Sequence, residues 1–187
     1  GRPGKERSMR GADKGPSRAL ASCTLAVCLL GDAGARTAAA DRGPAVRNPR
    51  PRPAIEDKVP ELRWARARAR ERLGRSGCQA VLADFESVNG GRLDLVLRST
   101  GRTAQEQLDL LVLQSGLGRP LCDHGASLAF TRIGSSAVSV CLRRFTLLRP
   151  PEQDAVLIHE MLHSLGLGEN PPESVAITQR VLRRCGH

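Results

Sequence analysis

The feature that most constrains this chain is the segment Val156–Glu169, which reads VLIHEMLHSLGLGE. His159 and His163 are four residues apart, and on a helix this spacing places both imidazole rings on one face. Glu160 projects about 100° round the helix from His159, because a helix has about 3.6 residues per turn. The pattern therefore predicts a helix that directs two imidazoles toward one point, with a carboxylate close by.

Bulky uncharged residues surround these polar side chains, so the helix is expected to be buried. They are Val156, Leu157, Ile158, Met161, Leu162 and Leu165. Burying two imidazoles and a carboxylate is costly unless something pairs with them. Zinc binds neutral imidazole nitrogen and uses three protein ligands in catalytic sites. We therefore expect one zinc ion (Zn2+) at His159 and His163, with Glu160 as general base. The alternative is a core helix whose histidines bond to backbone, which leaves Glu160 unexplained.

The run HEMLHSLGLGE, His159–Glu169, resembles the metzincin signature HExxHxxGxxH, with Gly166 at the glycine where the chain turns back beneath the metal. It is also similar to small exported bacterial metallopeptidases that read HE-L-HSLGLGENPPSS, over Cys78–Cys185. The resemblance implies a zinc peptidase in which an edge strand binds extended substrate by strand addition. Two features depart from the metzincin pattern. Glu169 stands at the third histidine, and no Met follows Met161 to form the Met turn.

The resemblance implies that Glu169, six residues after His163, is the third zinc ligand. Carboxylate oxygen is an accepted zinc ligand, and the glycines before Glu169 free the chain to reverse toward the metal. The alternative is an ion pair between Glu169 and an arginine, in which case His124 or Glu173 becomes the candidate. His124 is otherwise predicted to be a surface loop residue, and Glu173 to begin a helix, where acidic residues are favoured. The terminal His187 is expected outside the site.

Six cysteines are present, and two of them fall in an N-terminal segment with the features of a secretory signal. The other four are widely spaced without a CxxC pair, which favours disulfides in an oxidising compartment over a metal cluster or free thiols. Four cysteines allow three pairings, and the sequence does not choose among them. A hairpin turn near Gly134 would bring Cys141 close to Cys122, so the pairing that we favour is Cys122–Cys141 with Cys78–Cys185.

The N-terminal segment combines a possible start at Met9, basic residues, an apolar run at Ala19–Leu30 and an Ala38-Ala39-Ala40 cleavage site. The apolar run is too short to remain as a membrane-spanning helix, so no stable membrane insertion is expected after its removal. The predicted location is secreted or periplasmic.

The chain is expected to divide into three parts. Residues 1–40 are upstream sequence plus signal peptide, 41–75 are a Pro/Arg-rich linker or propeptide arm, and 76–187 are a zincin-like catalytic domain. Within the arm, 61–73 has alternating charge and is predicted to be an exposed helix or a frayed extension.

The predicted fold class is α+β, with a small mixed sheet and hairpin packed on the HExxH helix between N- and C-terminal helices. Strands are predicted at 92–98, 127–131 and 137–142, the last two as a hairpin. Helices are predicted at 78–87, 103–110 with Thr103 and Glu106 as a capping box, 150–165, and 173–184 with Val175, Ile177, Val181 and Leu182 on its apolar face. Residues 110–113 either continue a helix or begin a strand.

The formal charge of +10 comes almost entirely from arginines that are spread along the chain. Aromatic residues make up 2% of the sequence, so the stacking surface of a single-strand binder is missing. We expect no nucleic acid partner, a peptide or protein substrate, and a monomer. The function expected is that of an exported zinc-dependent peptidase. The alternative is a non-catalytic exported binding domain that retains a zinc site.

Overall fold

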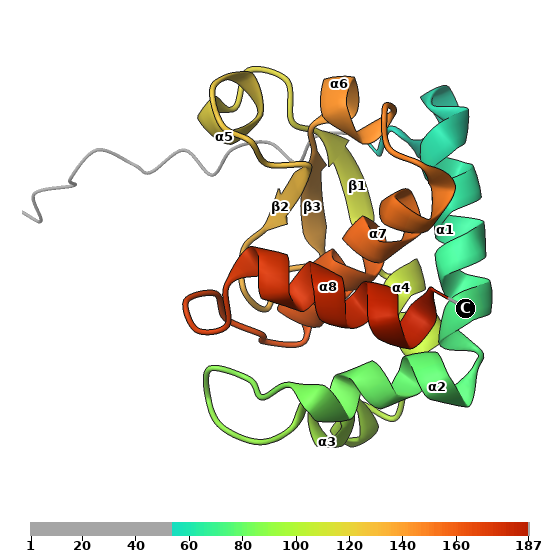
Figure 1. Ribbon diagram of the computed structural model, residues 1–187, viewed down its shortest axis with the longest axis vertical. Coiled ribbons are helices and arrows are strands. Elements are labelled where there is room, and N and C mark those ends of the chain that lie inside the picture. The colour runs from blue at the N-terminus through green and yellow to red at the C-terminus, as the bar shows by residue number, and fades with distance from the viewer. Residues whose placement is uncertain (1–53, 187) are drawn as a thin grey trace, which may run out of the picture. The chain divides into compact units, whose positions relative to one another are not determined.

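The computed structural model describes residues 54–186, which form an α+β fold with helices around a three-stranded mixed sheet (Figure 1). This confirms the predicted fold class. The predicted signal segment, residues 41–53 of the predicted arm, and His187 lie outside the described residues. The helices are α1 (Pro60–Leu73), α2 (Ser76–Gln79), α3 (Leu93–Ser99), α4 (Ala104–Asp109), α5 (Pro120–Asp123), α6 (Leu142–Phe145), α7 (Pro150–Ser164) and α8 (Ser174–Cys185), with 3₁₀ helices η1 (Glu56–Lys58) and η2 (Ala80–Asp84).

The sheet has the order β1-β3-β2, which leaves β2 at one edge. The strands are β1 (Val112–Ser115), β2 (Ala129–Thr131) and β3 (Ala137–Val140). β2 and β3 pair antiparallel with Phe130 opposite Ser139, which confirms the predicted hairpin. β1 pairs parallel to β3, so the ambiguous segment 110–113 leads into a strand.

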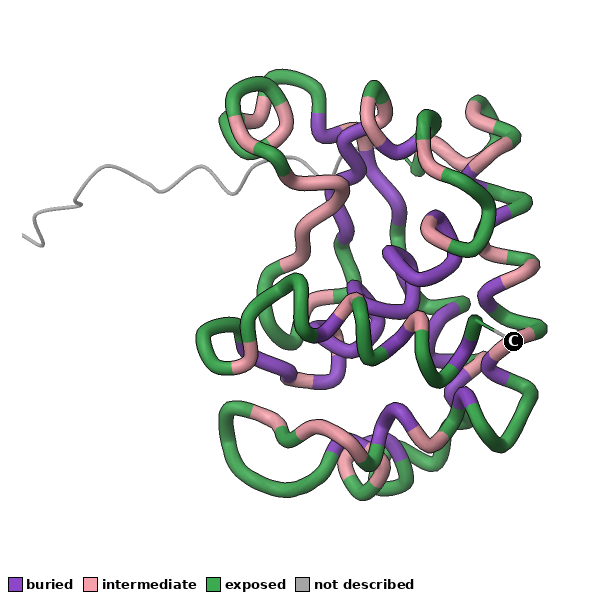
Figure 2. Tube along the Cα trace, in the orientation of Figure 1, coloured by how far each residue is buried: buried purple, intermediate pink, exposed green. Residues whose placement is uncertain are grey.

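Helix α7 is the central element and carries the HExxH segment. Pro150 and Pro151 open it, and Gly166, with φ of +102°, follows its end, as predicted. All its residues from Gln153 to His163 are buried (Figure 2). α7 packs against α1, α4, α8 and β2, so most of its side chains contact other parts of the fold. None of the helices within residues 54–186 has the length and apolarity needed to span a membrane.

Helix α1 corrects the expectation of an exposed or frayed segment at 61–73. Its residues Leu62, Ala65, Ala69 and Leu73 have no exposed surface, and they form one helical face that packs on α7. Two of these four are alanines, which contribute little apolar signal but let two helices approach closely. The compact fold therefore includes this helix.

The segment 92–98, predicted to be a strand, is the helix α3. Leu93 and Leu97 are buried while Leu95 is 51% exposed. Leucines at every second position also satisfy the four-residue spacing of a helical face, so the alternation alone did not distinguish the two structures. Asp94 and Arg98, four residues apart, form an ion pair along this helix.

Of the three other predicted helices, two differ in detail from the structure and one has its predicted capping box. The helix predicted at 78–87 is instead α2 followed by the 3₁₀ helix η2, and it ends at Asp84. The Thr103–Glu106 capping box of α4 is confirmed. In α8 the buried residues include Ile177 and Val181, but Val175 is 65% exposed and does not belong to the packed face.

Two disulfide bonds join distant parts of the fold, and both predicted pairings are confirmed. Cys78–Cys185 links α2 to the end of α8, and Cys122–Cys141 links α5 to the residue before α6.

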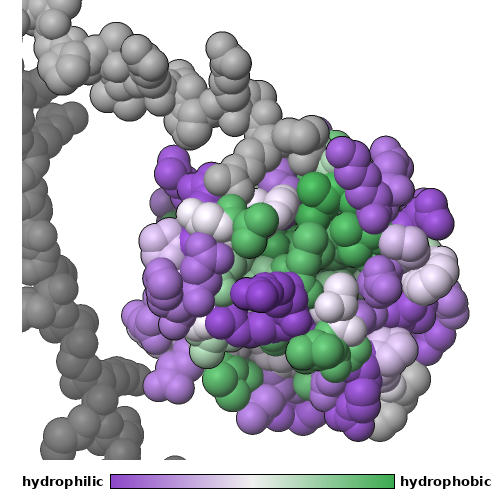
Figure 3. Space-filling view, turned by 90° about the horizontal axis from the view of Figure 1, so that it is seen from above, coloured by the Kyte–Doolittle hydropathy of each residue, from purple (hydrophilic) through white to green (hydrophobic). Residues whose placement is uncertain are grey.

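Large apolar side chains are exposed near α5 and α6, namely Leu117, Leu121 and Leu147. Seen from this end, apolar surface gathers in one area with hydrophilic residues around it (Figure 3).

Asp154 is a buried carboxylate on α7 that two arginines of α1 neutralise. Its Oδ1 accepts a hydrogen bond from Arg68 at 2.9 Å, and its Oδ2 accepts one from Arg72 at 2.9 Å. The Asp154 side chain is 1% exposed. The ion pairs therefore fix α1 against the helix that carries the HExxH residues.

Replacing Asp154 with Asn should reduce the free energy of unfolding by about 3 kcal/mol, because it leaves two partly buried guanidinium groups without their counter-charge. Asp109→Asn is the matched control, since the Arg70–Asp109 pair is 52% and 42% exposed. This control should cost less than about 1 kcal/mol. Urea unfolding of both variants measures the two changes in the free energy of unfolding. Equal decreases in the two variants would contradict the prediction.

Candidate metal centre

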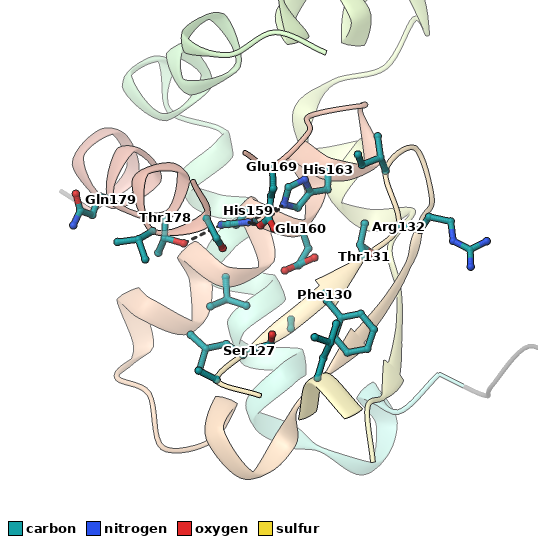
Figure 4. Close-up of a pocket in the computed structure, with 18 residues that line it drawn as sticks. Ser127, Phe130, Thr131, Arg132, His159, Glu160, His163, Glu169, Thr178 and Gln179 are labelled. Carbon is teal, nitrogen blue, oxygen red and sulfur yellow. Dashed lines mark hydrogen bonds and ion pairs between the residues drawn. The ribbon is translucent and has the colours of Figure 1, made fainter. Parts of the chain in front are cut away.

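The structure brings His159, His163 and Glu169 together at one point (Figure 4). The Nε2 atoms of the two histidines are 2.9 Å apart. Glu169 Oε1 lies 3.4 Å from His159 Nε2 and 3.3 Å from His163 Nε2. Two imidazole nitrogens and one carboxylate oxygen thus face a common position.

The turn after α7 carries Glu169 back toward the histidines. Gly166 has a left-handed φ, which most side chains avoid, and Leu167 N donates to Leu162 O at 3.1 Å. The next glycine is confined by packing, since a Cβ on Gly168 would lie 2.7 Å from the side chain of Val88. The glycines were expected to free the chain to turn, and the structure adds that Gly168 lets it pass beside Val88.

Each histidine is oriented through its other ring nitrogen. His163 Nδ1 lies 2.8 Å from Leu167 O, and a carbonyl only accepts, so Nδ1 carries the hydrogen. In the neutral ring, Nε2 then presents its lone pair to the shared position. His159 Nδ1 lies 2.9 Å from the hydroxyl of Thr178, a residue of α8 (Figure 4). Such second partners hold metal-binding histidines in place.

The environment of His159 favours its neutral ring. Burial is the main cause that lowers the pKa of His159 to about 4, and the neighbouring His163 lowers it further. Glu169 acts in the opposite direction. At neutral pH His159 is therefore uncharged, which is the form that binds a metal.

Glu160 lies next to this group and is 4% exposed. Its Oε2 is buried without a hydrogen-bond partner within the described part of the chain. Burial, and then the charge of Glu169, raise the pKa of Glu160 to about 8. A buried carboxyl oxygen without a partner marks a position where another polar group would be stabilised.

These residues lie on a cleft with a volume of about 770 Å³. Its walls come from residues 126–133, which include the edge strand β2, from α7, and from the first turns of α8. Glu160 points from α7 into this cleft (Figure 4). The candidate metal centre is thus reached from a cleft that β2, α7 and α8 line together.

The competing candidates for the third ligand lie elsewhere. His124 is exposed at the end of α5, and Glu173 is exposed at the N-cap of α8. Neither belongs to the His159–His163–Glu169 group. Thr178 was missed by sequence reasoning, because a threonine in the middle of a helix carries no signal of its contact with a histidine 19 residues earlier.

The residues present fit a borderline divalent cation. Two neutral imidazole nitrogens and one carboxylate oxygen form a donor set that zinc accepts. All three candidate donor atoms lie within 4.8 Å of one another. The unpartnered oxygen of Glu160 beside them gives the site a second polar group that the fold itself does not use.

No protein-family model matches this chain, and no curated protein or solved structure matches it. The resemblance to metzincins therefore rests on the motif residues.

In metal-free protein, Glu160→Gln should raise stability increasingly as the pH rises from 5 to 8. The folded-state pKa is raised from 4.5 to about 8, so over this range the folded protein retains a proton that the unfolded chain has lost. Stability of the parent then falls with rising pH, by at most about 5 kcal/mol in total. Glutamine does not ionise and escapes this loss.

Thermal unfolding in the presence of a chelator, at pH 5 and pH 8, measures the difference. Glu152→Gln is the control, since Arg149 holds the pKa of Glu152 below its usual value and this carboxylate stays ionised across the interval. Its stability relative to the parent should not change between the two pH values. If the stability of Glu160→Gln relative to the parent is also the same at pH 5 and pH 8, the pKa of Glu160 is not raised, and its carboxylate has a partner in solution.

Proposed function

We propose that this protein is an exported zinc-dependent peptidase. One observation carries the proposal: the Nε2 atoms of His159 and His163 and Oε1 of Glu169 converge beside the buried, unpartnered carboxyl of Glu160. A buried histidine pair alone would be satisfied by hydrogen bonds within the core. The added Glu160 on the wall of an open cleft favours a catalytic site instead.

His159, His163 and Glu169 would hold the metal. When bound, zinc supplies Lewis acidity that polarises a carbonyl group and makes water more acidic. Two neutral imidazoles and one carboxylate leave a net charge of +1 at such a site. This charge is lower than that of a three-histidine site, so the metal would be a weaker Lewis acid there.

Glu160 would serve as the general base. Its carboxyl lies in the same cleft wall as the histidines, and its Oε2 has no competing hydrogen bond. A cation held beside Glu160 would lower its pKa from the raised value of the metal-free protein, so that the carboxylate could accept a proton and then pass it to the leaving nitrogen of a peptide bond. Burial in α7 fixes its position, so no rearrangement of the helix is needed to present it.

The cleft favours an extended peptide as substrate. β2 is an edge strand, and Ala129–Thr131 line the cleft along their whole length. An edge strand offers unpaired backbone groups that can bind a peptide as an additional strand. Of the two strands of the predicted hairpin, β2 lies at the edge of the sheet and β3 in its centre.

The two disulfides support the export part of the proposal. Disulfides persist in oxidising compartments and are rare where thiols are kept reduced. Both bonds lie in the same compact unit as the candidate metal centre.

Glu160→Gln should abolish hydrolysis while zinc is retained. The loss of a general base costs about 10²- to 10⁴-fold in rate. Zinc content follows from native mass spectrometry, and hydrolysis from mass analysis of a peptide library incubated with parent and variant. Undiminished hydrolysis by the variant would rule out Glu160 as the base. A zinc-loaded parent that cuts nothing but binds a partner tightly would favour the non-catalytic binding domain.

Glu169→Ala should weaken zinc binding by more than about 100-fold, since losing even an outer partner of a ligand costs 10- to 100-fold. Glu173→Ala, a nearby exposed carboxylate outside the group, is the matched control and should bind zinc like the parent. Competition with a chromophoric chelator gives both affinities. Unchanged affinity in Glu169→Ala would remove Glu169 from the ligand set, whereas retained binding in Glu169→His would support it.

A further inference from the structure

The two ends of the cleft differ in chemistry. Toward the start of α7, the lining side chains of Leu121, Leu128 and Val156 are apolar. Toward the end of α7, the cleft is lined by Arg132 and Ile133, which directly follow β2. Arg132 is the only arginine or lysine among the described residues that line the cleft.

The apolar end is held in place by covalent and polar contacts. The Cys122–Cys141 disulfide ties the segment that carries Leu121 to the end of β3. Arg144 Nη1 donates to Cys122 O at 2.8 Å and to Ser127 O at 3.4 Å. This wall is therefore shaped before any substrate arrives.

The opposite end is held by the metal-binding helix itself. Gly134 N donates to His163 O at 2.9 Å, and Ser135 N donates to Arg132 O at 2.8 Å. These bonds fix the backbone of the β2–β3 turn relative to the candidate metal centre. The Arg132 side chain extends outward from the turn at the end of the cleft (Figure 4).

The Arg132 guanidinium is available for an external partner. It is exposed, and within residues 54–186 its side chain makes no hydrogen bond or ion pair. Many other arginines of the domain are engaged, such as Arg66 with Glu56 and Arg184 with Asp84. An unpaired cation that projects from a fixed turn beside an edge strand is suited to a carboxylate carried by an extended peptide.

We propose that the cleft selects peptides with an acidic residue facing Arg132 and an apolar residue against Leu121, Leu128 and Val156. This inference rests on the proposed peptidase function and names its substrate class. His159 and Glu160 lie between the two ends, so the scissile bond falls between the two selected residues. Antiparallel pairing with β2 is the more stable arrangement and places the acidic residue on the N-terminal side of the cut.

The test uses zinc-loaded, disulfide-intact protein and fluorogenic peptides. One Glu is moved along the N-terminal half of a peptide with an apolar residue after the cut, and each peptide has a Gln counterpart. At one position the parent should prefer Glu about fivefold in kcat/KM, the upper range for an exposed ion pair. High salt should reduce this preference, because it screens exposed charges.

Arg132→Gln should remove the preference, and Arg132→Glu should reverse it in favour of Lys. Arg143→Glu changes the charge equally at an exposed arginine outside the cleft and should leave the preference intact. A Glu preference that survives Arg132→Gln, or that is equally lost in Arg143→Glu, would overturn the assignment.

Binding of the same peptides, labelled for fluorescence anisotropy, separates this inference from the proposed function. Hydrolysis of Glu and Gln peptides at equal rates would overturn the inference and leave the peptidase function in place. If the protein binds Glu peptides more tightly than Gln peptides, loses this difference in Arg132→Gln and hydrolyses neither, the peptidase function is overturned and the recognition of an acidic residue by Arg132 is supported. Neither binding nor hydrolysis would overturn both.

Discussion

The burial of helix α7 is the constraint on which this structure depends. A buried helix must satisfy the polar side chains it carries, and the ionisable residues in the buried part of α7 are an aspartate, a glutamate and two histidines. Asp154 meets two arginines of α1, and each histidine meets an oxygen through Nδ1. Glu160 alone keeps an unpartnered oxygen. The rest of the fold thus supplies partners for all these groups except Glu160, which lines the cleft together with the two histidines.

This constraint also explains which parts of the site could be predicted from sequence. The His159–Glu160–His163 spacing is local, and the helix repeat converts it directly into a shared face. The approach of Glu169 depends on a short turn with a glycine at its start, which is also visible locally. Thr178 belongs to another helix, and its position depends on how α8 packs across α7. Such contacts follow from tertiary packing, and no periodic pattern in the sequence indicates them.

The fold shows the same division. The hairpin and the capping box at Thr103 were predictable because turn residues and caps act over short distances. The sequence left three disulfide pairings open, and the predicted hairpin favoured the one that the structure shows. The strand predicted at 92–98 failed because leucines at alternate positions fit a helical face equally well. Helix α1 was misjudged because alanine and arginine composition does not reveal burial. Its alanines allow close packing, and its Arg68 and Arg72 are used against Asp154.

The Cys78–Cys185 bond encloses α7, the turn to Glu169 and most of α8, and the Cys122–Cys141 bond lies nested within that loop. Any single break of the backbone between Cys78 and Cys185 therefore leaves the two fragments covalently joined. A nicked molecule would migrate as one species until its disulfides were reduced. If the candidate site cleaved the chain itself at an exposed turn of this loop, a non-reducing gel would not detect the autoproteolysis. The donors of the metal centre would remain tethered in one molecule after such a cut.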